Sequence, residues 1–260
     1  MSSDHSSPAP ALPSAPGSVA AVALAGVAGF VDAAGFLTLG GVFTAHMSGN
    51  SARLGVRLGQ GDLSAAVPMV VAIALFVFGV AAGALASELW MRRGRGTTVA
   101  VVLAAQAALL AAFMLYGASV VKANGGVHGH SLARFYVLMA LLVVAMGIQT
   151  TSIQKVGGRR LRTTYVTGVL TDLTQQALNR TVAGRGGRPS YLRDTLGLGD
   201  RDEAGFRVKL LGGISALYLG GAVLGAFLQI QWHTWCIAVP LGVLVAVIAV
   251  DVARPLNPRA

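Results

Sequence analysis

Six apolar segments, each long enough to cross a bilayer, dominate this sequence. The first, from Val19 to Leu39, would reach about 31 Å as a helix at roughly 1.5 Å per residue, enough to cross a hydrocarbon core of about 30 Å. The others run at about 65–90, 97–121, 132–153, 208–230 and 234–252. Only 12% of the residues are charged, against roughly 25% in soluble domains. We therefore predict an all-α membrane protein with six transmembrane helices.

One stretch of the chain occurs twice. The first copy reads GFVDAAGFLTLGG and then VFTAHMSGNSARLG, and the second reads MGIQTTSIQKVGG and then, after a two-residue insertion, LRTTYVTGVLTDLT. In this alignment Asp32 matches Gln149, and Gly40-Gly41 matches Gly157-Gly158. We expect an apolar helix to break at each glycine pair and a helix with one polar face to follow it.

Three crossings separate the two copies, so the second copy enters the bilayer from the opposite side. We therefore predict two inverted three-helix repeats, at about 18–121 and 132–252, an arrangement found in many transporters. Glycines spaced four residues apart fall in corresponding helices of the two repeats, where they allow helix backbones to approach closely. These are Gly79 and Gly83 in the first repeat and Gly221 and Gly225 in the second.

An alternative is that the polar pieces at 43–60 and 162–182 also cross the membrane. The chain would then have eight spans and a parallel repeat. We disfavour this topology, because Arg53 and Arg57 would lie in the hydrocarbon at a cost of about 2.5 to 3.5 kcal/mol each. The pieces are expected to be half-inserted or interfacial.

The basic residues indicate an orientation. Of the 20 Lys and Arg residues, 16 fall on the side that holds both ends of the chain and the 154–209 region. Because basic residues gather in cytoplasmic loops, we predict that both termini are cytoplasmic in a bacterial inner membrane. The same bias accounts for the net charge of +10 without nucleic-acid binding. We expect a disordered tail at 1–17, one membrane domain at 18–252, a cytoplasmic loop at 183–206 and a C-terminal tail at 253–260.

Asp32 is the sharpest functional signal in the first copy. An ionisable group inside a spanning helix is costly and is functional by default, although it could also hold the bundle together by bonding a neighbouring helix. His46, Ser48, Gly49 and Asn50 follow the first glycine break. There the N-terminus of a half-inserted helix would bind a ligand, while Ser-Gly-Asn also suits a turn or a cap.

The second copy offers a counterpart set of polar residues. Its members are Gln149, Thr164, Thr167, Gly168 and Asp172. Threonine in an apolar helix often bonds back to the preceding turn, so each threonine alone is weak evidence. Their recurrence at matching positions in both copies is the reason to predict that the two sets bind a substrate together.

Other charged and reactive residues receive structural interpretations. We expect Glu88 to pair with Arg92, and Asp251 with Arg254. The single cysteine, Cys236, allows no disulfide within the chain. Because no zinc-protease, P-loop or nucleophile-elbow motif occurs, we predict neither an enzyme nor a cofactor or metal site.

Three motifs carry a resemblance to a known family. They are Gly29-x-x-Asp32-Ala33, Phe43-x-Ala45-x-x-Ser48-Gly49-Asn50 and Thr163-Thr164-Tyr165-Val166-Thr167-Gly168. Together they resemble the YoaK-like family (DUF1275) of uncharacterised bacterial multi-pass membrane proteins, over roughly residues 18–252. The resemblance implies an inner-membrane protein and brings no established substrate. The chain departs from the family pattern at Gln149-Thr150, where Gln-Asn is expected.

The sequence favours a secondary transporter or facilitator of a small solute, coupled to protons through Asp32. Its expected partners are the lipid bilayer, the unknown solute and a second copy of the chain, packed through the glycine faces of the second and fifth segments. The rival interpretation is a membrane scaffold or sensor that does not transport. In that case the basic 154–209 region would bind anionic lipid or a partner protein.

Overall fold

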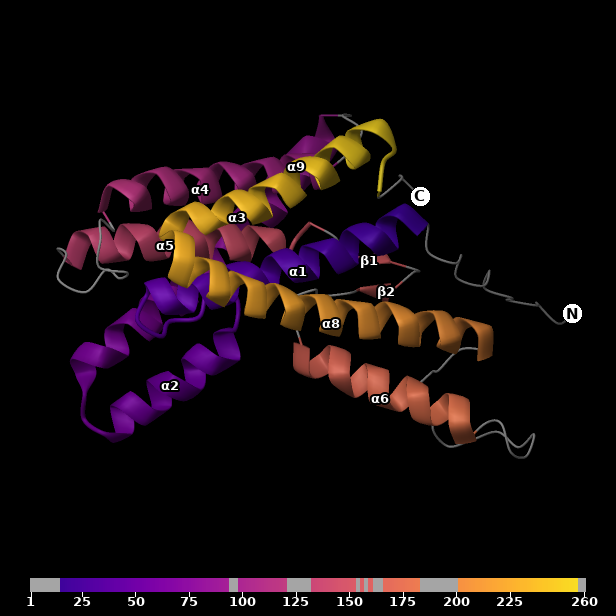
Figure 1. Ribbon diagram of the computed structural model, residues 1–260, viewed down its shortest axis with the longest axis horizontal. Helices are drawn as coiled ribbons and strands as arrows, with labels where there is room; N and C mark the ends of the chain where they lie inside the picture. The colour runs from indigo at the N-terminus through magenta and orange to yellow at the C-terminus, as the bar shows by residue number, and fades with distance from the viewer. Residues whose placement is uncertain are drawn as a thin grey trace, which may run out of the picture.

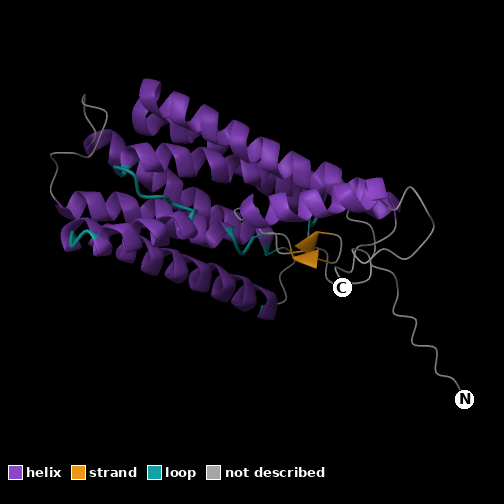
Figure 2. Cartoon of the chain, turned by 90° about the horizontal axis from the view of Figure 1, so that it is seen from below, coloured by secondary structure: helices purple, strands orange, loops and turns teal. Residues whose placement is uncertain are grey.

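The computed structural model describes residues 15–93, 98–120, 132–152, 155–156, 159–160, 166–182 and 201–256. Within these residues the protein is helical apart from one pair of two-residue strands. Five stretches are long and apolar enough to cross a membrane. Most of the helices lie along the long axis of the molecule (Figure 2). The prediction of an all-α chain with several candidate membrane spans is confirmed.

Four of the candidate spans are single helices. They are α1 (Ala15–Thr38), α3 (Leu63–Arg92), α4 (Val99–Val120) and α5 (Leu132–Gln149). The fifth, Val208–Ala253, has 46 residues, more than twice the roughly 20 that one crossing needs. It combines most of α8 (Arg201–Trp232), a 3-10 turn η2 (His233–Ile237) and α9 (Ala238–Ala253). In Figure 1 the chain reverses at this turn, so that α9 runs back in the direction opposite to α8.

The start of α8 overlaps the predicted cytoplasmic loop at 183–206. Residues 183–200 lie outside the described part, but the helix already begins at Arg201. Its first residues, Arg-Asp-Glu-Ala, include good helix formers, so α8 extends beyond its apolar part.

Two shorter helices follow α1 and α5. They are α2 (Met47–Gly59, 13 residues) and α6 (Val166–Val182, 17 residues), which reach only about 20 Å and 26 Å. Neither is a candidate span among the described helices. Figure 1 shows both below α1 and α8, beginning near the middle of the molecule and running toward opposite ends. The predicted helical piece of each copy is therefore present.

The two glycine pairs differ in their surroundings. After α1 ends at Thr38, Gly40 and Gly41 have φ of +61° and +96°, a left-handed conformation that glycine adopts without steric cost. The helix thus breaks at the first glycine pair, as predicted, and the chain reverses direction there. The second pair lies outside the described residues, and its flanks, Lys155–Val156 and Arg159–Arg160, form an antiparallel strand pair.

The end of α5 explains why the second helix does not continue to its glycine pair. The hydroxyls of Thr150, Thr151 and Ser152 donate to the carbonyls three residues before them, at 2.7–2.8 Å. These bonds take up carbonyls of the last turn, so the helix ends at Gln149. The prediction of a helix broken at Gly157-Gly158 is wrong.

Helices α1 and α8 run side by side in the same direction and touch through glycine (Figure 1). A Cβ atom built on Gly29 would collide with the carbonyl of Tyr218, and one built on Gly221 would collide with the carbonyl of Gly26. Such close approach lets backbone atoms of two helices pack directly.

Helices α3 and α5 form a second pair of the same kind. A Cβ on Gly79 would lie 2.6 Å from the carbonyl oxygen of Val144, and one on Gly147 would lie 2.5 Å from that of Phe76. The glycine faces of α3 and α8 are thus filled within the chain. The prediction that a dimer packs through these faces is wrong, and a homodimer would have to use another surface.

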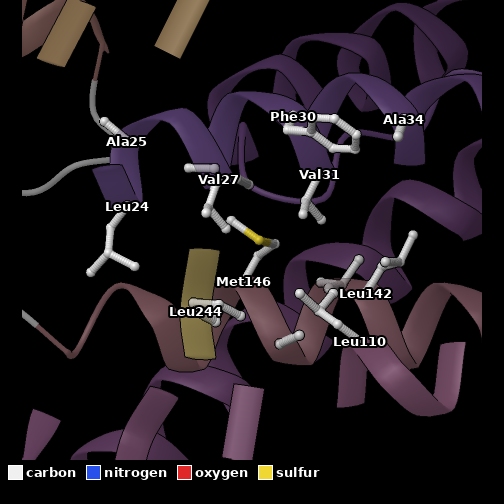
Figure 3. Packing of buried hydrophobic residues seen from close by; sticks show 14 of the residues in the cluster. Leu24, Ala25, Val27, Phe30, Val31, Ala34, Leu110, Leu142, Met146 and Leu244 are labelled. Atoms are coloured by element: carbon white, nitrogen blue, oxygen red, sulfur yellow. The ribbon is translucent and has the colours of Figure 1, made fainter. Parts of the chain in front are cut away.

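The apolar core lies between α1 and the helices α4, α5 and α9. Figure 3 shows Val27 and Val31 of α1 facing Met146 of α5, with Leu110 of α4 and Leu244 of α9 beside them. All five residues are at least 97% buried. α1 and α5 have the largest buried shares of the candidate spans, so they are the inner helices of the bundle.

The two predicted ion pairs have different outcomes. Arg92 Nε donates to Glu88 Oε1 at 2.8 Å, as predicted. Asp251 instead accepts the backbone N–H groups of Ala100 and Leu256, each at 2.8 Å. It therefore caps the start of α4 and holds the C-terminal turn, because backbone donors at a helix start need an acceptor. The predicted pair with Arg254 is wrong.

Neighbouring glycines of α8 test the close contact with α1. Gly221→Ala should lower the free energy of unfolding by about 1 to 3 kcal/mol, the usual cost of overpacking, because its methyl group meets the backbone of Gly26. Gly220→Ala is the control, since a Cβ there meets nothing within 4 Å. The measurement is the thermal midpoint of each variant purified in detergent. Equal midpoints for the two variants would contradict the described contact.

Candidate functional site

The carboxylate of Asp32 is buried inside a candidate span and is fully engaged. The residue is only 3% exposed. Its Oδ1 accepts the backbone N–H groups of Thr44 and Ala45, both at 2.7 Å, and the hydroxyl of Thr44 at 3.1 Å. Three donors from one loop therefore offset the cost of removing this oxygen from water.

The other oxygen of Asp32 belongs to a cluster of three titratable groups. Oδ2 lies 2.9 Å from Nδ1 of His46 and 2.9 Å from the hydroxyl of Tyr218, which are themselves 2.9 Å apart. Tyr218 donates to the carboxylate from α8. The Asp32–His46–Tyr218 centre thus joins α1, the loop that follows it and α8.

The loop reaches Asp32 by folding back along α1. Asp32 lies six residues before the end of α1, about 9 Å along the helix, yet Thr44 contacts it. Gly35 makes room for this return, since a Cβ there would collide with the side chain of Thr44. The segment 39–46 therefore re-enters the helix bundle along α1, and we call it the re-entrant loop.

Asn50 of α2 fixes the returning loop. Its Nδ2 donates to the carbonyl of Phe43 at 2.8 Å, and its Oδ1 accepts the N–H of Phe43 at 2.9 Å. The ring of Phe43 lies against Gly49, where a Cβ would be only 3.0 Å from it. Asn50 and Gly49 thus shape the loop that supplies the donors to Asp32.

A row of rings extends from the centre toward Arg53. Ring centroids are 5.6 Å apart for Tyr218 and His46, 5.9 Å for His46 and Phe43, and 4.6 Å for Phe43 and Phe36. The guanidinium of Arg53 lies 5.6 Å from the centroid of the Phe36 ring, a cation–π contact. One wall of the centre is therefore aromatic.

His46 is the member of the centre that reaches the surface of the helix bundle. It lies outside the candidate spans, its side chain is 29% exposed, and no hydrogen bond to its Nε2 is found in the described part of the chain. The hydrogen bond with Asp32 raises the pKa of His46 above its ordinary value of 6.5, although partial burial opposes the shift. The imidazole can therefore carry a proton near neutral pH.

Gln149 lies in a separate buried cluster. Its Nε2 donates to the carbonyl of Leu24 in α1 at 2.7 Å, and its Oε1 accepts from Nε2 of Gln106 in α4 at 2.6 Å. Leu24 lies eight residues before Asp32, about 12 Å along α1. The matching residues of the two copies, Asp32 and Gln149, thus occupy two separate polar centres.

Four of the five remaining predicted site residues lie on the short helices. Ser48 is exposed in the first turn of α2. Thr167 and Asp172 are exposed on α6, and Gly168 is half-buried there. Thr164 lies outside the described residues. Among the residues that are described, no group of three or more His, Cys, Asp and Glu side chains is arranged to hold a metal ion.

Comparison with known proteins identifies the family. A model described as a protein of unknown function, DUF1275, matches residues 20–250. The chain belongs to the YoaK-like DUF1275 family. The UPF0700 transmembrane protein YoaK of Bacillus subtilis (strain 168) is 30% identical over 219 residues, which cover 82% of this chain and 84% of YoaK. No solved structure matches. With the apolar helices, this relationship makes the DUF1275 chain a multi-pass membrane protein.

Sequence reasoning missed two polar residues of this DUF1275 protein. Tyr218 lies well inside an apolar helix, away from the membrane edges where tyrosine is usually found. Gln106 interrupts the apolar run VVLAAQAALLAAF. In both cases a lone polar residue within a spanning segment was the available signal.

The bond between His46 and Asp32 should make stability depend on pH. Because the folded-state pKa of His46 is raised, its contribution is fully present below the unfolded value of 6.5 and is lost as pH rises through the folded value. The thermal midpoint of the wild type should therefore exceed that of His46→Asn most at pH below 6.5, and the difference should shrink at alkaline pH. His233→Asn is the control and should keep the pH dependence of the wild type. A difference that stays constant across this range would contradict the prediction.

Proposed function

We propose that this protein is a secondary transporter or facilitator of a small solute, coupled to protons through Asp32. The observation that carries the proposal is the Asp32–His46–Tyr218 centre: a carboxylate buried in a candidate span, bonded to a partly exposed imidazole. An ionisable residue inside a membrane segment is typically part of an ion or substrate pathway.

The geometry supports a short proton route. A proton from water would bind Nε2 of His46, and the proton on Nδ1 would pass to Oδ2 of Asp32, 2.9 Å away. Neutralising Asp32 weakens its charge-assisted bond with the hydroxyl of Tyr218. Because Tyr218 belongs to α8, protonation at the centre would change the contact between α1 and α8. The protein would act by this movement, without a chemical reaction or a cofactor.

The packing supports two inverted halves with six crossings. The first helix of one half packs on a helix of the other half, α1 on α8 and α5 on α3, each time in the same direction and through glycine. The α1–α8 pair and the α3–α5 pair run in opposite directions, and α2 and α6 also run in opposite directions (Figure 1). Such an exchange follows from a two-fold axis in the membrane plane, the symmetry of inverted-repeat transporters.

The ends of the described helices support the proposed orientation. Figure 1 shows α1 beginning and α9 ending at the same end of the molecule, as an even number of crossings requires. The same end holds the basic strand pair Lys155–Val156 and Arg159–Arg160. We place this end in the cytoplasm of a bacterial cell, by the positive-inside rule.

One observation favours the scaffold or sensor as a second candidate. Oδ1 of Asp32 accepts three hydrogen bonds from the re-entrant loop, which is what a purely structural anchor would do. In that case the carboxylate would fix the loop, and the basic 154–209 region would bind anionic lipid or a partner. The two candidates differ in what loss of the charge at Asp32 does.

Asp32→Asn removes the charge of the side chain but keeps an oxygen that can anchor the loop. The amide oxygen can still accept from Thr44 and Ala45, so the variant should fold and melt within a few degrees of the wild type. Solute-driven acidification should be lost in proteoliposomes that contain a pH dye and are screened with a metabolite panel. Asp251→Asn is the control for loss of a buried carboxylate, because Asp251 is also buried but accepts only from backbone N–H groups, one at each oxygen. Its amide keeps one of these two bonds, so the folding of this variant is checked first.

The outcomes divide the candidates clearly. Coupled uptake in the wild type and in Asp251→Asn, but not in Asp32→Asn, would support proton coupling at Asp32. Uptake that survives Asp32→Asn unchanged would remove Asp32 from the mechanism. Absence of solute-dependent flux in all three proteins, with stable folding of each, would favour the scaffold or sensor.

A further inference from the structure

The glutamine pair in the centre of the bundle has unused hydrogen-bonding capacity. Gln106 is 0% exposed and Gln149 is 1% exposed. Gln106 Nε2 donates to Gln149 Oε1, but Oε1 of Gln106 receives no hydrogen bond within the described part of the chain. A buried carbonyl oxygen without a donor is costly, so this oxygen is poised to accept one.

The unused hydrogen-bonding groups of the two glutamines determine which kind of small molecule, here called the guest, could bind to them. Oε1 of Gln106 has lone pairs to offer, and each amide has a second N–H beyond the one already used. A guest must therefore donate a hydrogen bond to Oε1 of Gln106, and it binds more tightly if it also accepts one from a free amide N–H. No charged side chain hydrogen-bonds to either amide among the described residues. A charged guest would lose its hydration without a counter-charge, so an uncharged guest is favoured.

The pair also lies between the two proposed halves. Gln106 belongs to α4 in the first half, Gln149 to α5 in the second, and Leu24 to α1 in the first. Both bonds of Gln149 therefore cross from one half to the other. Rocking of the halves would break these bonds and expose the same polar atoms to a guest.

We propose that the Gln106–Gln149 pair binds the transported solute, and that this solute is a small uncharged molecule with both donor and acceptor groups, of the amide or polyol class. The assignment rests on the proposed transport function. It gives separate roles to two centres that contact α1. The Asp32–His46–Tyr218 centre binds the proton, and the glutamine pair, which contacts α1 about 12 Å away along the helix, binds the solute.

Thermal unfolding of the purified full chain in detergent tests the proposal. The uncharged probes are urea, acetamide, glycerol and erythritol at millimolar concentration, with ammonium chloride and sodium acetate as charged comparators. A ligand of the folded state raises the thermal midpoint. We expect at least one uncharged probe, and neither charged one, to raise the midpoint of the wild type.

Gln106→Met removes the free oxygen at similar volume. It should weaken binding of the stabilising probe by about tenfold, the factor expected for one lost hydrogen bond. Gln229→Met is the matched control, since Gln229 is also buried but bonds Cys236 instead. If Gln106→Met does not fold, the double variant Gln106→Met/Gln149→Met replaces it, because exchanging both partners for apolar groups can be nearly neutral.

Several results would overturn the assignment. No stabilisation by any of the four uncharged probes, or stabilisation by a charged probe alone, would reject the solute class. Stabilisation that persists in Gln106→Met would reject the location. Proton coupling is measured separately through Asp32→Asn, so the glutamine site and the proposed proton route can fail independently.

Discussion

The burial of one carboxylate dictates the local structure around the end of α1. A charged oxygen in an apolar interior must be matched by donors, and a single apolar helix has none to spare. The chain supplies them by returning along the helix, through two left-handed glycines and past a glycine that leaves room for Thr44. Asp32 therefore determines where the loop lies, where α2 starts and which residue of α8 must be polar.

Glycine has a different role in the helix bundle. In a membrane no hydrophobic effect drives helices together, so association depends on close packing and on a few polar bonds. Here the inner helix α1 meets α8 through glycine and the inner helix α5 meets α3 in the same way. Each inner helix also has a polar bond to another helix, from Asp32 to Tyr218 of α8 and from Gln149 to Leu24 of α1. The bundle is thus held together by backbone contacts and by two small polar centres.

Much of this architecture can be predicted from sequence, because length and apolar composition alone decide where a chain can span a bilayer. Asp32 and His46 were also identifiable, since each is anomalous in its segment. Their partner Tyr218 was not, because it lies 186 residues from Asp32 and the contact depends on how α8 packs. The glycine spacings predicted close approach but not the partner helix. The end of α5 was missed because three consecutive hydroxyl side chains can bond to the last turn of a helix.

The pair of hydrogen bonds between the Asn50 side chain and the Phe43 backbone couples α2 mechanically to the loop before it. Because one amide holds both the N–H and the carbonyl of Phe43, the re-entrant loop and α2 must move as one body. α2 continues for nine residues beyond Asn50. A force applied to that outer part, for example by lipid or by a bound molecule, would be transmitted to the donors of Thr44 and Ala45. The buried carboxylate can therefore be influenced through α2 without any ligand reaching it.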